Sequence, residues 1–207
     1  MKKIENVFGK GTIYEEKDLK GKIYVTCAAC MSLWSDLLSF ANKHKERFTN
    51  NPDVADTIVV LGCQVTDLVI LNDLNVAERL CKKYNKEIYM GGCIAQRFDI
   101  KLPKYIKRLD VIRELYQDID DFSLIHFEKP FWVTDFEESE DDLKEGNLFR
   151  NFYPLQIGAG CNGNCKYCTI KHTRGDVVVL PPENQIEIFL KHDKVVLISD
   201  NPTASQI

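Results

Sequence analysis

Three cysteines lie close together in the last third of the chain, as Cys161, Cys165 and Cys168. Three glycines accompany them in the stretch Gly-Ala-Gly-Cys-Asn-Gly-Asn-Cys-Lys-Tyr-Cys, residues 158–168. A structural zinc ion closes a shell of four ligands, whereas three thiolates on a four-iron cluster leave one iron open for an outside ligand. The Cys-x3-Cys-x2-Cys spacing therefore favours an iron-sulfur cluster. The alternative is a zinc site that takes His172 as its fourth ligand.

A second group of cysteines is spread over the N-terminal half. Cys27, Cys63 and Cys93 each end an apolar stretch that predicts a buried strand, over residues 21–27, 57–63 and 87–93. Ligands of open α/β sheets bind outside the carboxyl ends of the strands, so we expect these three thiols to converge at one sheet edge. The alternative is three buried thiols that hold no ligand.

The two other cysteines carry less information. Cys81 falls on the apolar face of a predicted helix, where a thiol acts as a small hydrophobic group. Cys30 forms Cys-Ala-Ala-Cys with Cys27, which is the spacing of a redox dithiol. Cys30 could equally be an extra ligand or a residue that starts a helix.

The composition is that of an ordinary globular protein, with 44% hydrophobic and 28% charged residues, which excludes overall disorder. No apolar run reaches the roughly 18 residues that a membrane helix needs, and the N-terminal stretch lacks the apolar core of a signal peptide. We therefore expect a cytoplasmic protein without a membrane partner. In that reducing compartment, clustered cysteines are more often metal ligands or catalytic thiols than disulfides.

Helices and strands alternate along the chain. Helices are predicted over residues 33–48, with Ser32 as the N-cap, over 68–84 and from 94, and a short fourth strand over 111–115. A second series follows, with strands over 152–158, 176–180 and 194–199 and a helix over 181–192. This order predicts an α/β fold with an N-terminal open, mostly parallel sheet, flanked by helices, and the opening of a second βαβ series.

The charge pattern suggests where the parts divide. The net charge of -4 does not match the bulk positive charge of a typical nucleic-acid binder, and the lysines between 82 and 107 are more typical of solvated helix faces than of a phosphate-facing rim. A nearly unbroken acidic run covers residues 134–146 and predicts an exposed connection. We expect a first domain over 1–130, a linker over 131–150 and the start of a second domain over 151–207.

The cysteine loop resembles the signature of the radical S-adenosyl-L-methionine (SAM) enzymes, in which an aromatic residue, here Tyr167, precedes the third cysteine. The stretch from Gly160 to Gly175 is similar to the methylthiotransferase branch, which also carries three cysteines in an N-terminal domain. Those three match Thr26-Cys27, Leu61-Gly-Cys63 and Gly92-Cys93-Ile-Ala-Gln96. The ending Lys171-His172-x-Arg174-Gly175 is closest to the group that methylthiolates threonylcarbamoyladenosine in tRNA.

The resemblance implies two 4Fe-4S clusters, one on each cysteine triad, with SAM bound at the open iron of the loop cluster. An electron from that cluster would cleave SAM to a 5′-deoxyadenosyl radical, which takes a hydrogen from the target adenosine. The second cluster would supply the sulfur that carries a methyl group from another SAM. Tyr167 is expected near the adenine of SAM, whereas Asn162 and Arg174 are expected to shape the loop.

The resemblance also implies tRNA as the substrate and an electron donor such as flavodoxin or ferredoxin. The family has a longer βα barrel than residues 151–207 provide, so we expect an N-terminal portion or a truncated member. The strand that ends at Ser199 should then be exposed unless another chain completes the barrel. The alternatives are a non-catalytic iron-sulfur protein and a methylthiotransferase that acts on a protein residue.

Overall fold

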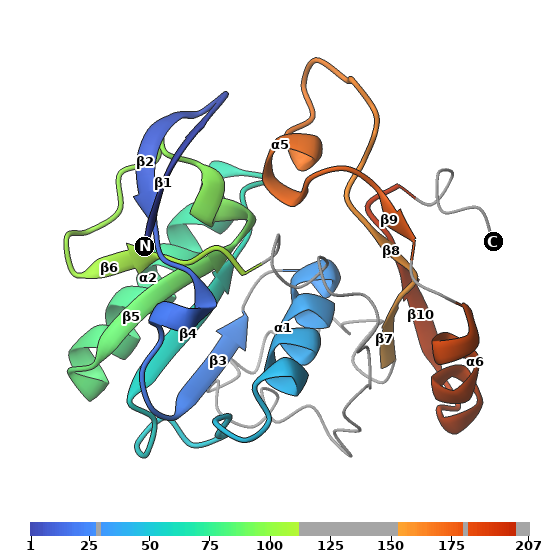
Figure 1. Cartoon of the computed structure of the whole chain (residues 1–207). Helices are drawn as coiled ribbons and strands as arrows, with labels where there is room; N and C mark the ends of the chain where they lie inside the picture. The colour runs from blue at the N-terminus through green and yellow to red at the C-terminus, as the bar shows by residue number, and fades with distance from the viewer. Residues whose placement is uncertain (28–29, 112–152, 180–181, 202–207) are drawn as a thin grey trace.

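The computed structural model describes residues 1–27, 30–111, 153–179 and 182–201 (Figure 1). The predicted acidic linker and both predicted domain boundaries lie outside these ranges. The described residues fall into an N-terminal half, up to residue 111, and a C-terminal half that begins at residue 153.

A parallel sheet forms the centre of the N-terminal half. Its strands are β3 (Ile23–Cys27), β4 (Thr57–Gly62), β5 (Glu87–Gly92) and β6 (Ile106–Arg108), in the spatial order β3-β4-β5-β6. The first three strands are buried almost throughout, which explains their continuous apolar sequences. The predicted α/β fold with a parallel sheet is confirmed. The fourth strand of the sheet is β6, which ends before the predicted strand over residues 111–115 would begin. Most of that predicted strand lies outside the described ranges.

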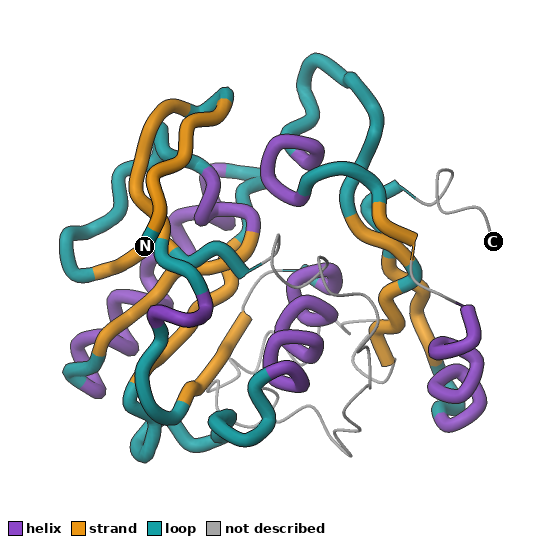
Figure 2. Tube along the Cα trace, viewed as in Figure 1, coloured by secondary structure: helices purple, strands orange, loops and turns teal. Residues whose placement is uncertain are grey.

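Two long helices cover opposite faces of this sheet (Figures 1 and 2). Helix α1 (Met31–Lys43) packs Leu33, Leu37 and Phe40 against one set of strand residues. Helix α2 (Asp67–Tyr84) packs Ile70, Val76 and Ala77 against the alternate set. Cys27 and Cys63 belong to the core cluster on the α1 face. Cys27 and Cys63 therefore lie in the layer between the sheet and α1.

The helix ends differ from the prediction in three places. Ser32 is not an N-cap, because α1 already begins at Met31. The same helix ends at Lys43 instead of Phe48, because Phe48 forms a parallel β-bridge with Ile23. The third predicted helix is only a 3-10 turn, η2 (Cys93–Gln96). None of the helices in the described residues is long and apolar enough to cross a membrane.

An N-terminal hairpin was not predicted from the sequence. Strands β1 (Lys2–Asn6) and β2 (Gly9–Ile13) pair antiparallel and are followed by a 3-10 turn, η1 (Glu16–Asp18). The hairpin attaches beside β6: Tyr14 N–H donates to the Arg108 carbonyl at 2.8 Å, and the Lys2 ammonium pairs with the buried Asp110 carboxylate at 2.9 Å. The hairpin thus covers an edge of the parallel sheet.

The C-terminal half contains two pairs of short strands and two helices. Strands β7 (Tyr153–Gln156) and β10 (Val195–Ile198) pair in parallel, and β8 (Gly158–Ala159) pairs antiparallel with β9 (Val178–Val179). Helix α5 (Ile170–Arg174) was not predicted, and α6 (Pro182–Lys191) matches its prediction closely. Within the described ranges β10 pairs with β7 alone, and Leu197 is 51% exposed. The radical SAM barrel stays a prediction.

Candidate functional site

The three N-terminal cysteines meet at the carboxyl edge of the parallel sheet. Cys27 is the last residue of β3, whereas Cys63 and Cys93 each follow their strand by one residue. Cys27 and Cys63 are 3% and 4% exposed and share one core cluster, and Cys93 and Cys30 pack against that cluster. The structure therefore brings the predicted triad together, along with Cys30. We call Cys27, Cys63 and Cys93 the sheet-edge set.

Close packing of two strands fixes the backbone beside this set. Gly62 and Gly92, which precede Cys63 and Cys93, are paired in the sheet. Gly92 has a φ of 74°, and a Cβ there would lie 2.7 Å from the Gly62 carbonyl oxygen and 2.9 Å from its nitrogen. Only glycine fits this position, because both the backbone conformation and the missing side chain are required.

A buried carboxylate holds the backbone of Cys63. Asp73 on α2 is fully buried, and its Oδ2 accepts the Cys63 N–H at 2.7 Å. Burial raises the pKa of Asp73 to about 6. Its other oxygen has no hydrogen-bond partner among the described residues. Helix α2 begins four residues after Cys63. Thr66 is its N-cap, and the Thr66 hydroxyl accepts a hydrogen bond from the Val69 N–H.

The thiols of the sheet edge do not share one electrostatic environment. A hydrogen bond donated by the Cys30 thiol lowers the pKa of Cys63 to about 6, and the charge of Arg174 acts in the same direction. The same hydrogen bond, together with burial, raises the pKa of Cys30. Burial raises the pKa of Cys93 to about 11, with Arg174 acting in the opposite direction. Of Cys63 and Cys93, Cys63 is thus the thiol more ready to bind a metal as thiolate.

Cys30 also starts α1, because its carbonyl oxygen accepts the Trp34 N–H at 3.1 Å. Of the three roles left open by the sequence, the helix-start residue is therefore observed. Its thiol contact with Cys63 leaves the other two as predictions.

The second group, Cys161, Cys165 and Cys168, lies on a loop after β8, and we call it the loop set. Cys165 is exposed, and the other two are half-buried. The Gly163 N–H donates to the Cys161 sulfur at 3.2 Å, and the Asn201 amide donates to the same sulfur at 3.4 Å. Asn162 shapes the loop, as predicted, because its side-chain oxygen accepts the Val177 N–H at 3.1 Å.

Gly163 keeps space open between two sulfurs of the loop set. A Cβ there would lie 3.1 Å from the Cys161 sulfur and 4.0 Å from the Cys165 sulfur. Three thiolates, an open space between them and an N–H donor to sulfur are features of an iron-sulfur cradle. The residues of the loop therefore fit such a cluster in their chemistry. Among the described residues, no three cysteine, histidine or acidic side chains are grouped tightly enough to hold a metal ion.

Residues next to the two sets bond to one another. Gln64, which follows Cys63, donates from Nε2 to the Thr169 hydroxyl at 2.8 Å and to the Thr173 hydroxyl at 3.0 Å. Thr169 in turn follows Cys168. The Phe8 ring of the N-terminal hairpin meets the His172 ring edge-on, with 6.2 Å between ring centroids. Helix α5 and Thr169, the residue after the last loop cysteine, are therefore docked directly onto the sheet edge.

Tyr167 and His172 were also singled out in the sequence. Tyr167 is 89% exposed, so its ring is available to a ligand. His172 lies on α5, in contact with Phe8. The contact of Tyr167 with the adenine of SAM and the zinc site completed by His172 stay predictions.

The buried acidic residues of the site were not predicted from the sequence. Asp36 and Asp73 are fully buried, and both lie on helices whose neighbouring residues form the core. An acidic residue on the apolar face of an amphipathic helix was the signal that could have found them, because such a residue needs a polar partner inside the protein. The partner itself was not visible in the sequence.

Known proteins resemble this chain over most of its length. It is 26% identical over 170 residues to tRNA-2-methylthio-N(6)-dimethylallyladenosine synthase of Helicobacter pylori, covering 77% of this chain and 38% of that protein. It is 26% identical over 196 residues to the probable threonylcarbamoyladenosine tRNA methylthiotransferase of Methanocaldococcus jannaschii, covering 88% of this chain and 44% of that protein. No protein-family model matches the chain.

These similarities show that the homologues of this chain are tRNA methylthiotransferases. The chain spans less than half the length of these curated relatives. Both kinds of methylthiotransferase are matched at the same identity, so the comparison does not favour one of them.

Proposed function

We propose that this chain is the N-terminal portion of a radical SAM methylthiotransferase that inserts a methylthio group into a modified adenosine of tRNA. One observation carries the proposal above all: one chain holds two sets of three cysteines, and Gln64, which follows Cys63, binds Thr169, which follows Cys168. The names of the relatives support the same reaction. Two separate triads suit two iron-sulfur clusters better than one metal ion.

The loop set would hold a 4Fe-4S cluster with one open iron for SAM, and the sheet-edge set would hold the second 4Fe-4S cluster. Bound there, the clusters would supply an electron for the cleavage of SAM and sulfur for the methylthio group. The protein provides ligands, orientation and control of water.

The burial of the two sets suits these two tasks. The loop set lies on an exposed segment, with Cys165 exposed and Tyr167 89% exposed, so SAM can approach it from solvent. The sheet-edge set has two nearly buried thiols, Cys27 and Cys63, so water is largely kept away from it. Gly163 and Asn201 donate hydrogen bonds to the Cys161 sulfur and so hold it in place within the loop.

We further propose threonylcarbamoyladenosine as the modified base, from the Lys171-His172-x-Arg174-Gly175 stretch. The same proposal places the protein in the cytoplasm and gives it an electron donor such as flavodoxin or ferredoxin. It also requires a further part of the barrel, in this or another chain. The short β7–β10 pair, to which no other described strand is added, favours a second candidate, an iron-sulfur protein that does not turn over alone.

Iron and sulfide counts after anaerobic reconstitution test the proposal. We expect about eight irons per chain, and an electron paramagnetic resonance spectrum that changes when SAM is added. Cys165→Ala should lose about four irons and all cleavage of SAM. Cys63→Ala should lose the other cluster, keep cleavage of SAM and stop methylthiolation.

The outcomes separate the candidates. Full methylthiolation by Cys63→Ala would contradict the two-cluster assignment. Eight irons without any response to SAM would favour the non-catalytic protein. Transfer to tRNA carrying threonylcarbamoyladenosine, but not to tRNA carrying dimethylallyladenosine, would establish the substrate, and the reverse result would reject it.

A further inference from the structure

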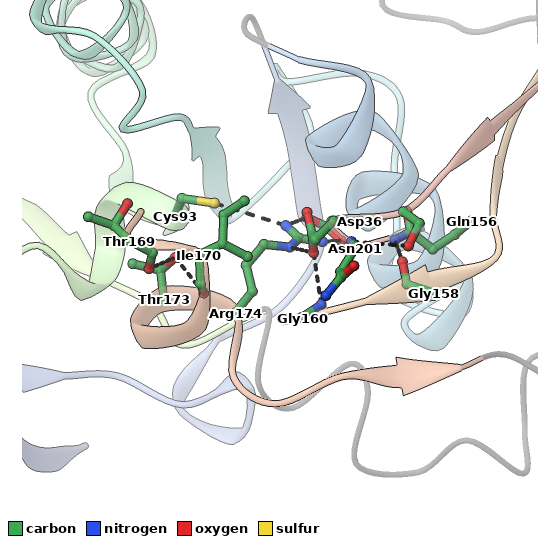
Figure 3. A network of polar contacts seen from close by, with 12 residues as sticks. Asp36, Cys93, Gln156, Gly158, Gly160, Thr169, Ile170, Thr173, Arg174 and Asn201 are labelled. Atoms are coloured by element: carbon green, nitrogen blue, oxygen red, sulfur yellow. Dashed lines mark hydrogen bonds and ion pairs between the residues drawn. The ribbon is translucent and has the colours of Figure 1, made fainter. Parts of the chain in front are cut away.

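A single buried arginine connects the two halves of the structure. The side chain of Arg174, the last residue of α5, is 2% exposed. Its Nη1 donates to Asp36 Oδ2 at 2.6 Å and its Nη2 to Asp36 Oδ1 at 2.9 Å (Figure 3). Asp36 is fully buried on α1, in the N-terminal half. The pair has the two-pronged geometry that only arginine can form with a carboxylate.

The third side of the same guanidinium contacts Asp200, which follows β10. Arg174 Nε donates to Asp200, and that carboxylate also accepts the Gly160 N–H at 2.8 Å. Gly160 directly precedes Cys161. The Arg174–Asp200 contact therefore holds the residue at which the cysteine loop begins.

Arg174 also reaches the sheet-edge set. Its Nη1 lies 4.0 Å from the Cys93 sulfur (Figure 3). One guanidinium is thus shared by Asp36, Asp200 and a thiol of the sheet edge.

We propose that Arg174 is a positioning residue that fixes the loop set relative to the sheet-edge set and directs its positive charge at the latter. The part that concerns charge rests on the proposed function, because it requires a cluster on Cys27, Cys63 and Cys93. The part that concerns position does not, because the contacts of Arg174 with Asp36 and Asp200 involve no metal.

Hydrogen exchange of the metal-free full chain, followed by mass spectrometry, tests the positioning role. In Arg174→Lys and Asp200→Asn, we expect the amides around Gly160 and along α5 to exchange at least about tenfold faster, because their local opening becomes easier. The amides of β4 and β5 should keep their rates. Asp99→Asn is the matched control, because it breaks an exposed arginine–aspartate pair within the N-terminal half.

Two results would overturn the positioning role. Unchanged exchange around Gly160 in both variants would mean that the contacts of Arg174 do not hold the loop. An equal acceleration in β4 and β5 would mean that Arg174 serves the stability of the whole fold instead. Arg174→Lys keeps the charge and Asp200→Asn keeps the arginine, so a folding failure of one variant leaves the other to decide.

The reduction potential of the sheet-edge cluster tests the charge. It is measured in a Cys165→Ala background, so that the loop cluster is absent. Arg174→Gln should lower the potential, because losing a nearby positive charge disfavours the more negative reduced state, and Arg174→Lys should restore most of the shift. Equal potentials in all three proteins would overturn this part. A parent protein that binds no iron would instead refute the proposed function, with the exchange result still valid.

Discussion

The two cysteine sets are held by opposite means. The sheet-edge set stands on the ends of three paired strands, and its thiols lie in the apolar layer under α1. The loop set stands on an exposed segment whose shape comes from single hydrogen bonds, such as those from Gly163 and Asn201 to Cys161. The first set is therefore built by the core of the fold, and the second by local contacts and by docking onto the first.

This difference shows how one chain can provide two unlike environments for the same ligand type. A sheet edge excludes water and fixes thiols firmly, which suits a ligand that is not exchanged with solvent. An exposed loop leaves a ligand accessible to a small molecule. The contrast matches the two roles in the proposed function, and substitutions at equivalent places in the two sets can test it.

The largest effect is expected from two glycines, of which one directly precedes Cys93 of the sheet-edge set and the other directly precedes Cys161 of the loop set. Gly92 has a φ of 74° and Gly160 a φ of 75°, and in each case an added Cβ would approach a backbone oxygen closely. Gly92→Ala should lower the free energy of unfolding by about 3–5 kcal/mol, from backbone strain and overlap. Gly160→Ala should spare the cooperative unfolding of the sheet and lose only the loop cluster. Urea unfolding and iron counts on both variants measure this.

If Gly160→Ala destabilised the whole fold as much as Gly92→Ala, the loop would be part of the core and the contrast would fail. If Gly92→Ala kept its full iron content, the sheet edge would be less rigid than the structure indicates.

A smaller difference is expected for the side chains that bind backbone N–H groups. Asp73→Ala leaves the buried Cys63 N–H without an acceptor and should cost about 1–3 kcal/mol of folding free energy. Asn162→Ala removes an exposed bond to the Val177 N–H, which water can replace, and should cost less than about 1 kcal/mol. Asp73→Asn is the control, since it keeps an acceptor without a charge. Equal costs for Asp73→Asn and Asp73→Ala would show that the Cys63 hydrogen bond is unimportant.

The smallest effect is expected at Cys81, a cysteine outside both sets. It is half-buried on α2 and packs against the core cluster on that face. Cys81→Ala removes one sulfur and should cost about 1 kcal/mol or less. The iron content and the response to SAM should not change. A loss of iron in this variant would mean that the assignment of the sheet-edge ligands is wrong.

The sequence predicted the parallel sheet well, because buried parallel strands leave a continuous apolar signal that is visible without tertiary contacts. The same signal placed Cys27, Cys63 and Cys93 at strand ends, within one residue of the observed positions. The N-terminal hairpin was missed because its strands are polar and half-exposed. The residues that it buries are buried only because the hairpin packs against the sheet, and this packing leaves no signal in the local sequence.

The contacts between the two halves could not be predicted from the sequence. Asp36 and Arg174 are separated by 138 residues, and nothing in the local pattern of either links them. The short helix α5 was missed for a related reason, because five residues carry too little periodicity and the helix is held by its contact with Gln64. The expectation that Arg174 shapes the loop stays a prediction, and its contact with Asp36 became visible only in the structure.

The separation of Asp36 from Arg174 has a consequence for how the protein is made. Strands β3 to β6 pair in the order in which they leave the ribosome, so the sheet and its three cysteines can form once Val111 has emerged. The contact of Arg174 with Asp36 needs roughly 60 further residues, which take about 3 to 12 seconds to synthesise. During that interval the nascent chain presents the sheet-edge thiols without the segment that later docks onto them. We therefore expect the sheet-edge cysteines to be accessible to iron and sulfide delivery early in synthesis, and to be covered later.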